Sequence, residues 1–262
     1  MRATMWCGVA LAVTVLGACE GPRATDPAAA DMVGPRATGR ADDAAFAFGP
    51  TAAPYGHDMI HWSQRWWKWA ERVPASENPL VDSVGQTCVN GQRGRVWNLP
   101  VLIAPATSGT RACTIPNGKA LVVNLSGVWN DYPCPDTSFH PAPGQSLYAF
   151  LIQGAAPIVG AAHDLTLTVD GQSLPNPTAY RFTSRALTYF TGSTTLDAVL
   201  DPCITGRRQA AISDGYFVMI KPLAPGRHVI SSAATDPAGT TAVTYDLTVR
   251  GDSDGDDGDD DP

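Results

Sequence analysis

The chain has 262 residues, of which 44% are hydrophobic and 16% charged, and its formal net charge is −7. Seven of the 25 Asp and Glu residues lie between Asp252 and Asp261, so the rest of the chain holds equal numbers of acidic and basic side chains. This balance excludes the broad basic face that nucleic-acid binding requires, and the length is sufficient for one sizeable hydrophobic core.

The first 18 residues have the features of a bacterial lipoprotein signal peptide. An apolar run over residues 5–17 follows a single arginine and ends in the lipobox Leu16-Gly17-Ala18-Cys19. Because the run has only about 13 residues, it is too short to span the roughly 30 Å hydrocarbon core of a membrane. We therefore expect cleavage before Cys19, lipidation of that cysteine with acyl chains such as palmitate, and a location in the cell envelope, at the outer membrane, in the periplasm or on the cell surface. An ordinary cleaved signal peptide is the alternative.

Residues 19–54 are predicted to form a lipidated, disordered tether. Pro, Ala, Gly and charged residues dominate this segment, and the pentapeptide at residues 21–25 recurs at residues 34–38. Such a composition supplies too few apolar side chains to form a core. The folded body is therefore expected over residues 55–250, held clear of the membrane surface.

Residues 57–74 carry the strongest helical pattern in the chain. At about 100° per residue, one apolar arc contains Met59, Trp62, Trp66, Trp69, Ala70 and Val73, with Ile60, Ser63 and Trp67 at its edges. The opposite side holds His61, Gln64, Arg65, Lys68, Glu71 and Arg72. Pro74 ends the helix because it cannot donate to the preceding turn. The pattern predicts a half-buried helix that packs its indole rings against a sheet.

Two alternatives remain for the tryptophan face. A helix lying in a membrane interface is supported by the basic residues on its polar side. A sugar-stacking platform would use Trp67, the ring at the edge of the arc. His57 and His61 have the i,i+4 spacing of a metal-binding pair. The nearby basic side chains disfavour a cation, so no metal site and no cofactor are predicted.

Four cysteines remain after the signal peptide and the lipidation site: Cys88, Cys113, Cys134 and Cys203. An even number in an exported protein indicates disulfide bonds, and four cysteines allow three pairings. We favour Cys88–Cys113 with Cys134–Cys203, because neighbours along the chain close the shorter loops. No two of the four have the close spacing of a zinc site.

From residue 95 onward, the hydrophobic period changes to two. The clearest strands are Leu165 to Val169, which ends at the tight-turn pair Asp170-Gly171, Val243 to Val249, Tyr216 to Ile220 and His228 to Ser232; weaker candidates are Val96 to Ile103, Ala120 to Leu125, Leu147 to Gln153 and Tyr180 to Thr183. About eight short strands among 22 prolines and 25 glycines indicate a mainly β protein. We predict an antiparallel β-sandwich, jelly-roll or immunoglobulin-like, with one N-terminal amphipathic α-helix.

Residues 251–262 are predicted to be an acidic disordered tail. Asp252, Asp254 and Asp256 have the spacing of the first ligands of a calcium loop. However, Asp257 replaces the required glycine and no glutamate follows at the twelfth position, so a solvated segment is favoured.

Several motifs together are similar to a family of uncharacterised bacterial secreted proteins and lipoproteins. They are Trp62-Ser63-x-x-Trp66-Trp67-x-Trp69, Cys88 with Gly91-Gln92-x-Gly94-x-Val96-Trp97, Cys113-Thr114-Ile115-Pro116-x-Gly118-Lys119-Ala120-Leu121, and Asp214-Gly215-Tyr216 followed by Pro222-Leu223-x-Pro225-Gly226-x-His228. The resemblance covers nearly all of residues 55–249 and implies no particular activity. Residues 223–249 alone also resemble the final hairpin of bacterial immunoglobulin-like domains.

No nucleophile elbow, zinc-protease helix, phosphate-binding loop or dinucleotide-binding motif is present in the sequence, so no catalytic residue is predicted. His228 is interpreted as a structural residue at the start of a strand, and Asp214-Gly215 as a turn into a strand.

The best candidate for binding is the predicted loop over residues 126–145, which Cys134 anchors near its middle. Its candidate ligand-binding residues are Trp129, Asp131, Tyr132 and His140, to which Trp67 is added from the helix. In the alternative interpretation, these rings close one end of the sandwich.

The sequence thus predicts a non-catalytic binding or structural module of the cell envelope, attached to a membrane by its lipid and able to bind a glycan or another small molecule. The competing prediction is a carbohydrate-active or hydrolytic enzyme that uses the aromatic loop and nearby carboxylates. No nucleic-acid partner is expected.

Overall fold

The computed structural model describes residues 44–102 and 107–251. Cys19, most of the predicted tether and the acidic tail beyond Gly251 lie outside the described residues. Within the described part, no helix is long and apolar enough to cross a membrane.

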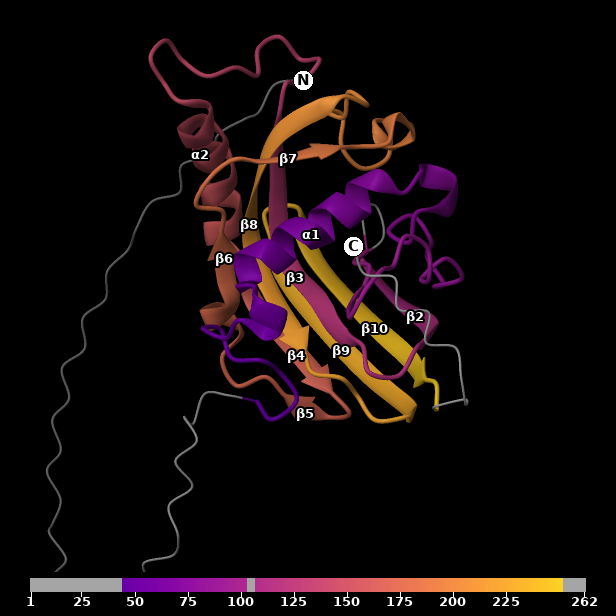
Figure 1. The fold of residues 1–262 in the computed structure, drawn as a ribbon. Helices are drawn as coiled ribbons and strands as arrows, with labels where there is room; N and C mark the ends of the chain where they lie inside the picture. The colour runs from indigo at the N-terminus through magenta and orange to yellow at the C-terminus, as the bar shows by residue number, and fades with distance from the viewer. Residues whose placement is uncertain (1–43, 103–106, 252–262) are drawn as a thin grey trace, which may run out of the picture. The chain divides into compact units, whose positions relative to one another are not determined.

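The described body contains two five-stranded sheets (Figure 1). One, here the β3–β8 sheet, consists of β1 (Val96–Asn98), β3 (Ala120–Tyr132), β8 (Arg208–Ile220) and β6 (Arg181–Thr183), with β7 (Thr188–Thr191) also paired to β8. The other, here the β9–β10 sheet, has the order β2 (Ser108–Ile115), β10 (Gly239–Val249), β9 (Gly226–Asp236), β4 (His163–Val169) and β5 (Gln172–Ser173). Their facing apolar side chains form one core, which confirms the predicted mainly β sandwich class.

The prediction that all strands pair antiparallel is wrong for two pairs. β1 runs parallel to β3, and β2 runs parallel to β10 over eight residue pairs. β2 was also missed from the sequence. Its buried positions begin with Arg111 and its exposed positions include Ala112, so the alternation of apolar and polar side chains is weak. The remaining ladders are antiparallel.

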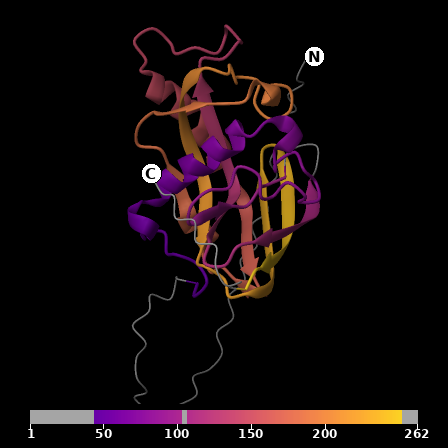
Figure 2. The same cartoon turned by 45° about the vertical axis from the view of Figure 1, so that its right-hand side comes forward.

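The predicted amphipathic helix is confirmed as α1 (Met59–Arg72). The Asp58 side chain accepts from His61 N at 3.0 Å and caps the first turn. The helix lies across the outer face of the β3–β8 sheet (Figure 2). The Trp66 indole donates to Leu99 O at 3.0 Å, and its ring contacts Phe217 with centroids 6.0 Å apart. The indole rings therefore belong to the core, as the amphipathic pattern predicted.

A second helix, α2 (Leu147–Gly160), replaces the strand predicted from Leu147 to Gln153. The Ser146 side chain caps it by accepting from Ala149 N at 3.2 Å. Its buried residues, Leu151, Ala155 and Val159, recur every four positions. Leu151 and Ala155 pack against Ile212 of β8, whereas Val159 joins the core between the sheets. The expectation of a single helix was wrong because a short, continuously apolar run does not distinguish a strand from a buried helix.

The folded body begins before residue 55, where the tether was expected to end. Phe48 N donates to Met219 O at 2.9 Å, and Lys221 N donates to Phe46 O at 2.8 Å. Ala47 is buried beside Ile220, the last residue of β8. Four short 3₁₀ turns complete the structure: η1 (Pro54–Gly56), η2 (Ala75–Glu77), η3 (Pro177–Tyr180) and η4 (Thr194–Leu196).

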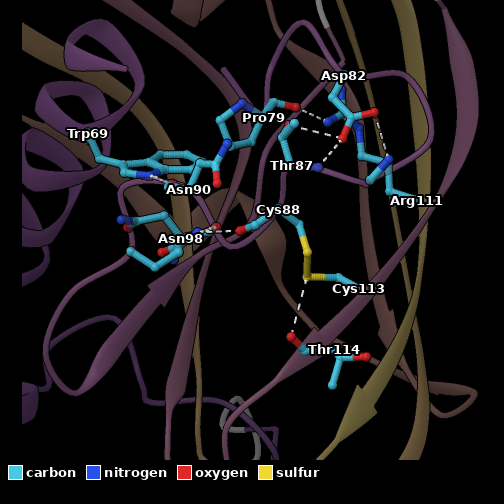
Figure 3. The surroundings of a disulfide bond; sticks show 12 residues. Trp69, Pro79, Asp82, Thr87, Cys88, Asn90, Asn98, Arg111, Cys113 and Thr114 are labelled. Atoms are coloured by element: carbon cyan, nitrogen blue, oxygen red, sulfur yellow. Dashed lines mark hydrogen bonds between the residues drawn. A yellow bond between two sulfur atoms is a disulfide. The ribbon is translucent and has the colours of Figure 1, made fainter. Parts of the chain in front are cut away.

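Both predicted disulfides are confirmed: Cys88–Cys113 and Cys134–Cys203. Beside the first bond, Arg111 is 1% exposed and anchors the preceding loop (Figure 3). Its guanidinium donates to the carbonyl oxygens of Pro79, Leu80 and Val101. Nothing in the sequence pattern distinguished this buried arginine from an exposed one.

The Asp170-Gly171 pair forms the predicted tight turn, with positive φ of 50° and 78° at its two residues. By contrast, Asp214-Gly215 is not a turn, because both residues lie inside β8. Gly215 lies opposite Gly127 of β3, and a Cβ at Gly215 would come within 2.6 Å of Gly127 Cα. The two glycines therefore permit a close approach of the central strands.

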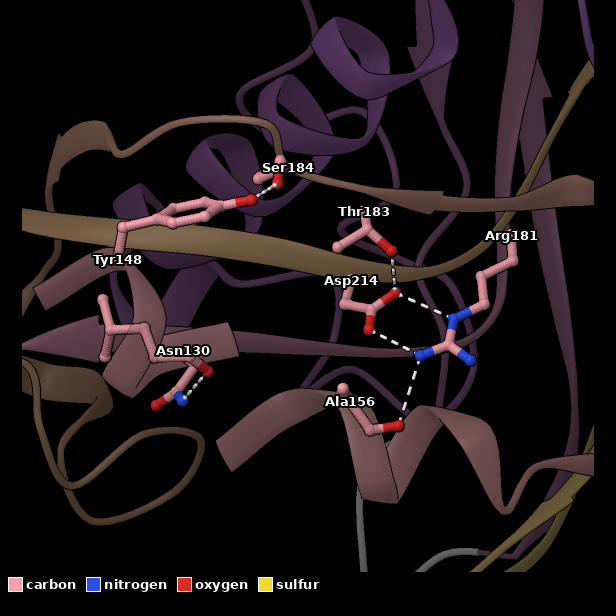
Figure 4. A network of polar contacts seen from close by, with 8 residues as sticks. Asn130, Tyr148, Ala156, Arg181, Thr183, Ser184 and Asp214 are labelled. Atoms are coloured by element: carbon pink, nitrogen blue, oxygen red, sulfur yellow. Dashed lines mark hydrogen bonds and ion pairs between the residues drawn. The ribbon is translucent and has the colours of Figure 1, made fainter. Parts of the chain in front are cut away.

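Asp214 is fully buried and is held by groups from β6 (Figure 4). Arg181 Nε and Nη2 donate to its two oxygens at 3.1 and 2.8 Å, and Thr183 Oγ1 donates at 2.8 Å. Arg181 Nη2 also donates to Ala156 O of α2 at 3.2 Å. This bidentate pair joins α2 to the sheet.

The variant Asp214→Asn should unfold with a free energy lower by about 3 kcal/mol, because it leaves the Arg181 charge without its buried partner. Urea unfolding followed by circular dichroism measures the difference. Asp246→Asn is the matched control, since it disrupts the exposed pair with Arg227 and should change stability little. Equal effects of the two substitutions would contradict the importance of the buried pair.

Candidate functional site

A row of buried side chains four residues apart runs along one side of α1, from Ser63 beside the sheet through Trp67 to Glu71. Trp129 and Asp131 of β3 lie two residues apart on the facing sheet. Four helical residues advance about 6 Å and two strand residues about 6.6 Å. Side chains four positions apart on α1 can therefore lie opposite side chains two positions apart on β3. The rings of Trp67 and Trp129 stack with centroids 6.2 Å apart and an interplanar angle of 24°.

Trp67 and Trp129 are each only 8% exposed. Trp129 also contacts Phe190 edge-on, with centroids 5.2 Å apart. The prediction that these two rings form an exposed binding surface is therefore wrong. They fill the space between helix and sheet, as predicted for the indole rings of the amphipathic helix. The indole N–H of each ring is buried and has no hydrogen-bond partner among the described residues.

The predicted loop over residues 126–145 is shorter than expected, because residues 126–132 continue β3. Tyr132 lies on the opposite face of the sheet from Trp129. There it packs against the apolar cluster that contains Leu151 of α2. His140 is exposed in the remaining loop, with its Nδ1 3.0 Å from Pro141 O. Of the five candidate residues, the structure thus brings together only Trp67, Trp129 and Asp131.

Asp131 is 2% exposed and accepts from Gln209 Nε2 at 2.7 Å. Burial raises its pKa to about 8, with a further contribution from Asp201, to which its side chain is hydrogen-bonded. Burial also raises the pKa of Asp201. Because two carboxylates cannot hydrogen-bond without a proton between them, this pair favours a protonated state.

Glu71, at the end of α1, is close enough to the same pair of carboxyl groups for their charges to affect its pKa. The helical pattern placed it on the exposed side, and this is wrong: Glu71 is 1% exposed. Burial raises its pKa to about 9, and the charges of Asp201 and Asp131 raise it further in that order. Its Oε2 atom has no hydrogen-bond partner in the described residues. Glu71, Asp131 and Asp201 are called the acidic cluster below.

Sequence reasoning missed Glu71 and Asp201, although one signal was available for the second. Asp131 precedes Cys134 by three positions and Asp201 precedes Cys203 by two. The predicted bond between these cysteines therefore already placed the two aspartates close together. The one sequence signal for Glu71 is its i+4 spacing from Trp67, which lies at the edge of the apolar arc.

A hollow of about 210 Å³ lies on the opposite, outward side of α1. It is lined by Arg65, Lys68, Trp69, Arg72, Gly91, Arg93 and Asn98. None of its four basic residues forms an ion pair with a carboxylate of the described chain. Lys68 Nζ donates to Thr188 Oγ1 at 2.6 Å, and burial lowers its pKa. This surface is called the basic hollow below.

A second cavity of about 180 Å³ is lined by Trp67 of α1, Asn124 of β3 and residues of β9 and β10. Ser126 Oγ donates to Asp236 Oδ2 at 3.2 Å in its lining. Asn124 Oδ1 is buried and has no hydrogen-bond partner in the part of the chain that the structure describes. Neither this cavity nor the basic hollow is lined by a member of the acidic cluster.

His228 has a structural environment, in agreement with its interpretation from the sequence. Its Nδ1 lies 2.7 Å from Asp170 Oδ2 and its Nε2 lies 2.8 Å from Ala224 O. Burial opposes its charge, but the hydrogen bonds to Asp170 and Ala224 outweigh burial and raise its pKa. The ring thus fastens the β4–β5 turn to the start of β9.

Comparison with known proteins gives no family. No protein-family model matches the sequence, and no curated protein matches it. Among solved structures, a chain from the complex of PbICP-C with falcipain-2 is similar at 12% identity and a TM-score of 0.23, over 60% of this chain and 100% of that one. So low a TM-score carries no argument. The resemblance of the tryptophan and Asp-Gly-Tyr motifs to bacterial secreted proteins stays a prediction.

The acidic cluster makes stability depend on pH in a defined direction. A carboxyl group whose pKa is higher in the folded state binds its proton more tightly there, so the free energy of unfolding falls as pH rises from about 4.5 to about 9. Urea unfolding in EDTA at several pH values should show this fall for the wild type and a smaller one for Glu71→Gln. Glu77→Gln, at an exposed glutamate, is the matched control. An unchanged pH dependence in Glu71→Gln would contradict the assignment.

Proposed function

We propose that the protein is a lipid-anchored, non-catalytic binding module of the cell envelope that holds anionic glycans in the basic hollow. The observation that carries this proposal is the set of four basic residues around one hollow without an ion-pairing carboxylate in the described chain. Charges left unpaired on one surface attract a ligand of opposite charge more strongly than paired ones.

Two features support export and anchoring. The lipobox at residues 16–19 provides a site for acylation at Cys19. The two disulfides are typical of proteins that fold in an oxidising compartment. A binding module attached in this way would meet the acidic polysaccharides of the cell surface.

The chemistry of the hollow favours carboxylate, sulfate or phosphate groups on a polymer. Three of its four cations are arginines, whose planar guanidinium groups bind such anions with two parallel hydrogen bonds. Asn98 adds an amide able to bind sugar hydroxyls, and Trp69 closes the floor of the hollow. A neutral sugar would leave the four charges unused.

The alternative of a hydrolytic enzyme has less support. An acid and a base must both reach the substrate. Glu71 and Asp131 are 1% and 2% exposed, and neither lines either cavity described above. The titratable groups with the most perturbed pKa values are therefore separated from the surface on which a substrate could bind.

Binding to polygalacturonate, with neutral dextran as the negative control, tests the ligand class. The double variant Arg72→Gln with Arg93→Gln should weaken binding at least about ten-fold, since each lost charged hydrogen bond costs more than 1 kcal/mol. Arg207→Gln with Arg250→Gln removes the same charge from two exposed positions elsewhere and should change affinity little. Equal losses in both double variants, or no binding by the wild type, would refute the proposal.

The anchor is tested separately by Cys19→Ala in the full chain. The variant should move from the membrane fraction to the soluble fraction, because it has no thiol to acylate. A Cys7→Ala variant, within the signal peptide, serves as the control. Retention of Cys19→Ala in the membrane would contradict lipid anchoring without affecting the proposal for the basic hollow.

A further inference from the structure

The second cavity described above is separate from the basic hollow, because the two share no lining residue. Buried residues of α1, β3 and the loop after β1 form its inner wall: Trp67, Leu102, Asn124 and Leu125. Partly exposed residues of β3, β9 and β10 form its rim: Ser126, Asp236 and Thr241. The cavity therefore has a buried inner end and an outer end near solvent. It is called the edge cavity below.

A free strand edge and a β-bulge shape the edge cavity. β1 pairs with β3 only over residues 120–122, where Leu99 N also donates to Val122 O at 2.9 Å. The ladder between β3 and β8 then shifts its register between Asn124 and Ser126. Bulges redirect side chains and are over-represented next to active sites. Beyond Val122, this edge of β3 has no strand partner in the described chain, and residues 124–127 line the cavity instead.

The inner wall contains polar groups without partners. Asn124 is 3% exposed, and its Oδ1 has no hydrogen-bond partner in the described residues. A Cβ at Gly127 would lie 3.2 Å from this oxygen, so the glycine leaves the space beside the amide open. The indole N–H of Trp67 likewise has no partner there. Because buried polar groups are almost always paired, an unpaired acceptor and an unpaired donor in one lining indicate a ligand that both donates and accepts.

The size and lining of the edge cavity fit one six-membered ring. An engineered cavity of about 150 Å³ binds benzene, and the edge cavity has about 180 Å³. Apolar side chains lie beside its polar groups: Trp67, Val101, Leu102, Leu125 and Val243. An apolar group displaces poorly ordered water from such side chains favourably, whereas the amide of Asn124 requires a hydrogen-bonding group. A pyranose ring offers both, with apolar C–H faces and hydroxyl groups around its edge.

The rim adds one negative charge, that of Asp236. Ser126 Oγ donates to its Oδ2 at 3.2 Å, and Ala238 N donates to its Oδ1 at 2.8 Å. Neither donor is charged, and Asp236 forms no ion pair within the described chain. The described lining contains no Lys, Arg or His. A carboxylate without a counter-ion favours a ligand that carries a positive charge and disfavours an anion.

We propose that the edge cavity binds a single amino sugar. The pyranose ring lies beside Trp67, its hydroxyl groups form hydrogen bonds with the Asn124 amide, and its protonated amino group donates to the Asp236 carboxylate. The ligand has the opposite charge to that of the anionic glycans proposed for the basic hollow. The two proposals therefore do not depend on each other.

The test is a ligand-observed NMR titration of the full chain with both disulfides formed, at about pH 6, where an amine is protonated. Glucosamine should bind with a dissociation constant on the order of 1 mM, as expected for about twelve non-hydrogen atoms. Glucose has a hydroxyl group in place of the amine and should bind at least about ten-fold more weakly, because it lacks the charged hydrogen bond. Galacturonic acid, an anion, should not compete with glucosamine.

Two variants in the cavity and one control assign the site. Asp236→Asn keeps an oxygen for Ala238 N but removes the charge, so it should weaken glucosamine binding at least about ten-fold and change glucose binding little. Asn124→Leu should abolish binding of both sugars. Because it replaces an unpaired buried amide by an apolar group of similar shape, it should need at least as much urea to unfold as the wild type. Asp197→Asn, at an exposed residue outside the cavity, should retain binding.

Three outcomes would overturn the proposal. The first is no binding of glucosamine by the wild type, since water alone would then occupy the cavity. The second is equal binding of glucosamine and glucose, or glucosamine binding that Asp236→Asn leaves unchanged. The third is loss of glucosamine binding in the double variant Arg72→Gln with Arg93→Gln, which would place the sugar in the basic hollow. If that double variant loses only polygalacturonate binding, the edge cavity is supported as a separate site.

Discussion

Burial of both faces of β8 is the constraint on which the rest of the structure depends. One face is covered by the β9–β10 sheet and α2, the other by α1. A strand in this position can carry a polar side chain only where a neighbour satisfies it. Asp214 is met by Arg181, Ser213 Oγ donates to Ser63 Oγ at 3.1 Å, and Gln209 donates to Asp131.

The same constraint explains why the acidic cluster stands out. Along β8, each buried polar group has a partner of complementary chemistry, either a guanidinium, a hydroxyl or an amide. At the end of the strand near Gln209, the buried polar groups instead include the carboxyl groups of the acidic cluster. Their pKa values are raised first by burial and then by the charges of neighbouring carboxylates. A departure of this kind, on a strand whose other polar side chains are paired, is typical of a functional site.

The parts of the fold with a local signal could be predicted from the sequence. The α1 arc, the Asp170-Gly171 turn and the disulfide pairing each depend on spacing over a few residues or on chain order. The prediction of a strand from Leu147 to Gln153 was wrong. The Ser146 cap and the recurrence of buried residues every four positions up to Val159 are features of a helix. β2 could not be found, since its parallel partner lies more than a hundred residues away.

The site was harder to predict because tertiary packing redefines which side of a helix is buried. Glu71 lies outside the arc that faces the sheet, but the segment after β7 covers that side as well, and Ser193 N donates to Glu71 O at 2.8 Å. Trp129 and Asp131 were identified as important from their positions, yet their expected exposure was wrong because β3 extends through them. The short sequence distance from Asp131 to Cys134 indicated the position of Asp131 in the structure better than the aromatic and polar residue types of the loop did.

The pairing of β2 with β10 has a consequence for the order in which the molecule can assemble. Within residues 44–102 and 107–251, β2 forms its ladder with β10 alone, and β10 is the last strand of this part of the chain. An incompletely synthesised polypeptide therefore leaves this edge without hydrogen bonds, and the second sheet closes only after residue 249 has emerged. Because the intervening loop must be closed before this ladder can form, such long-range pairing slows folding.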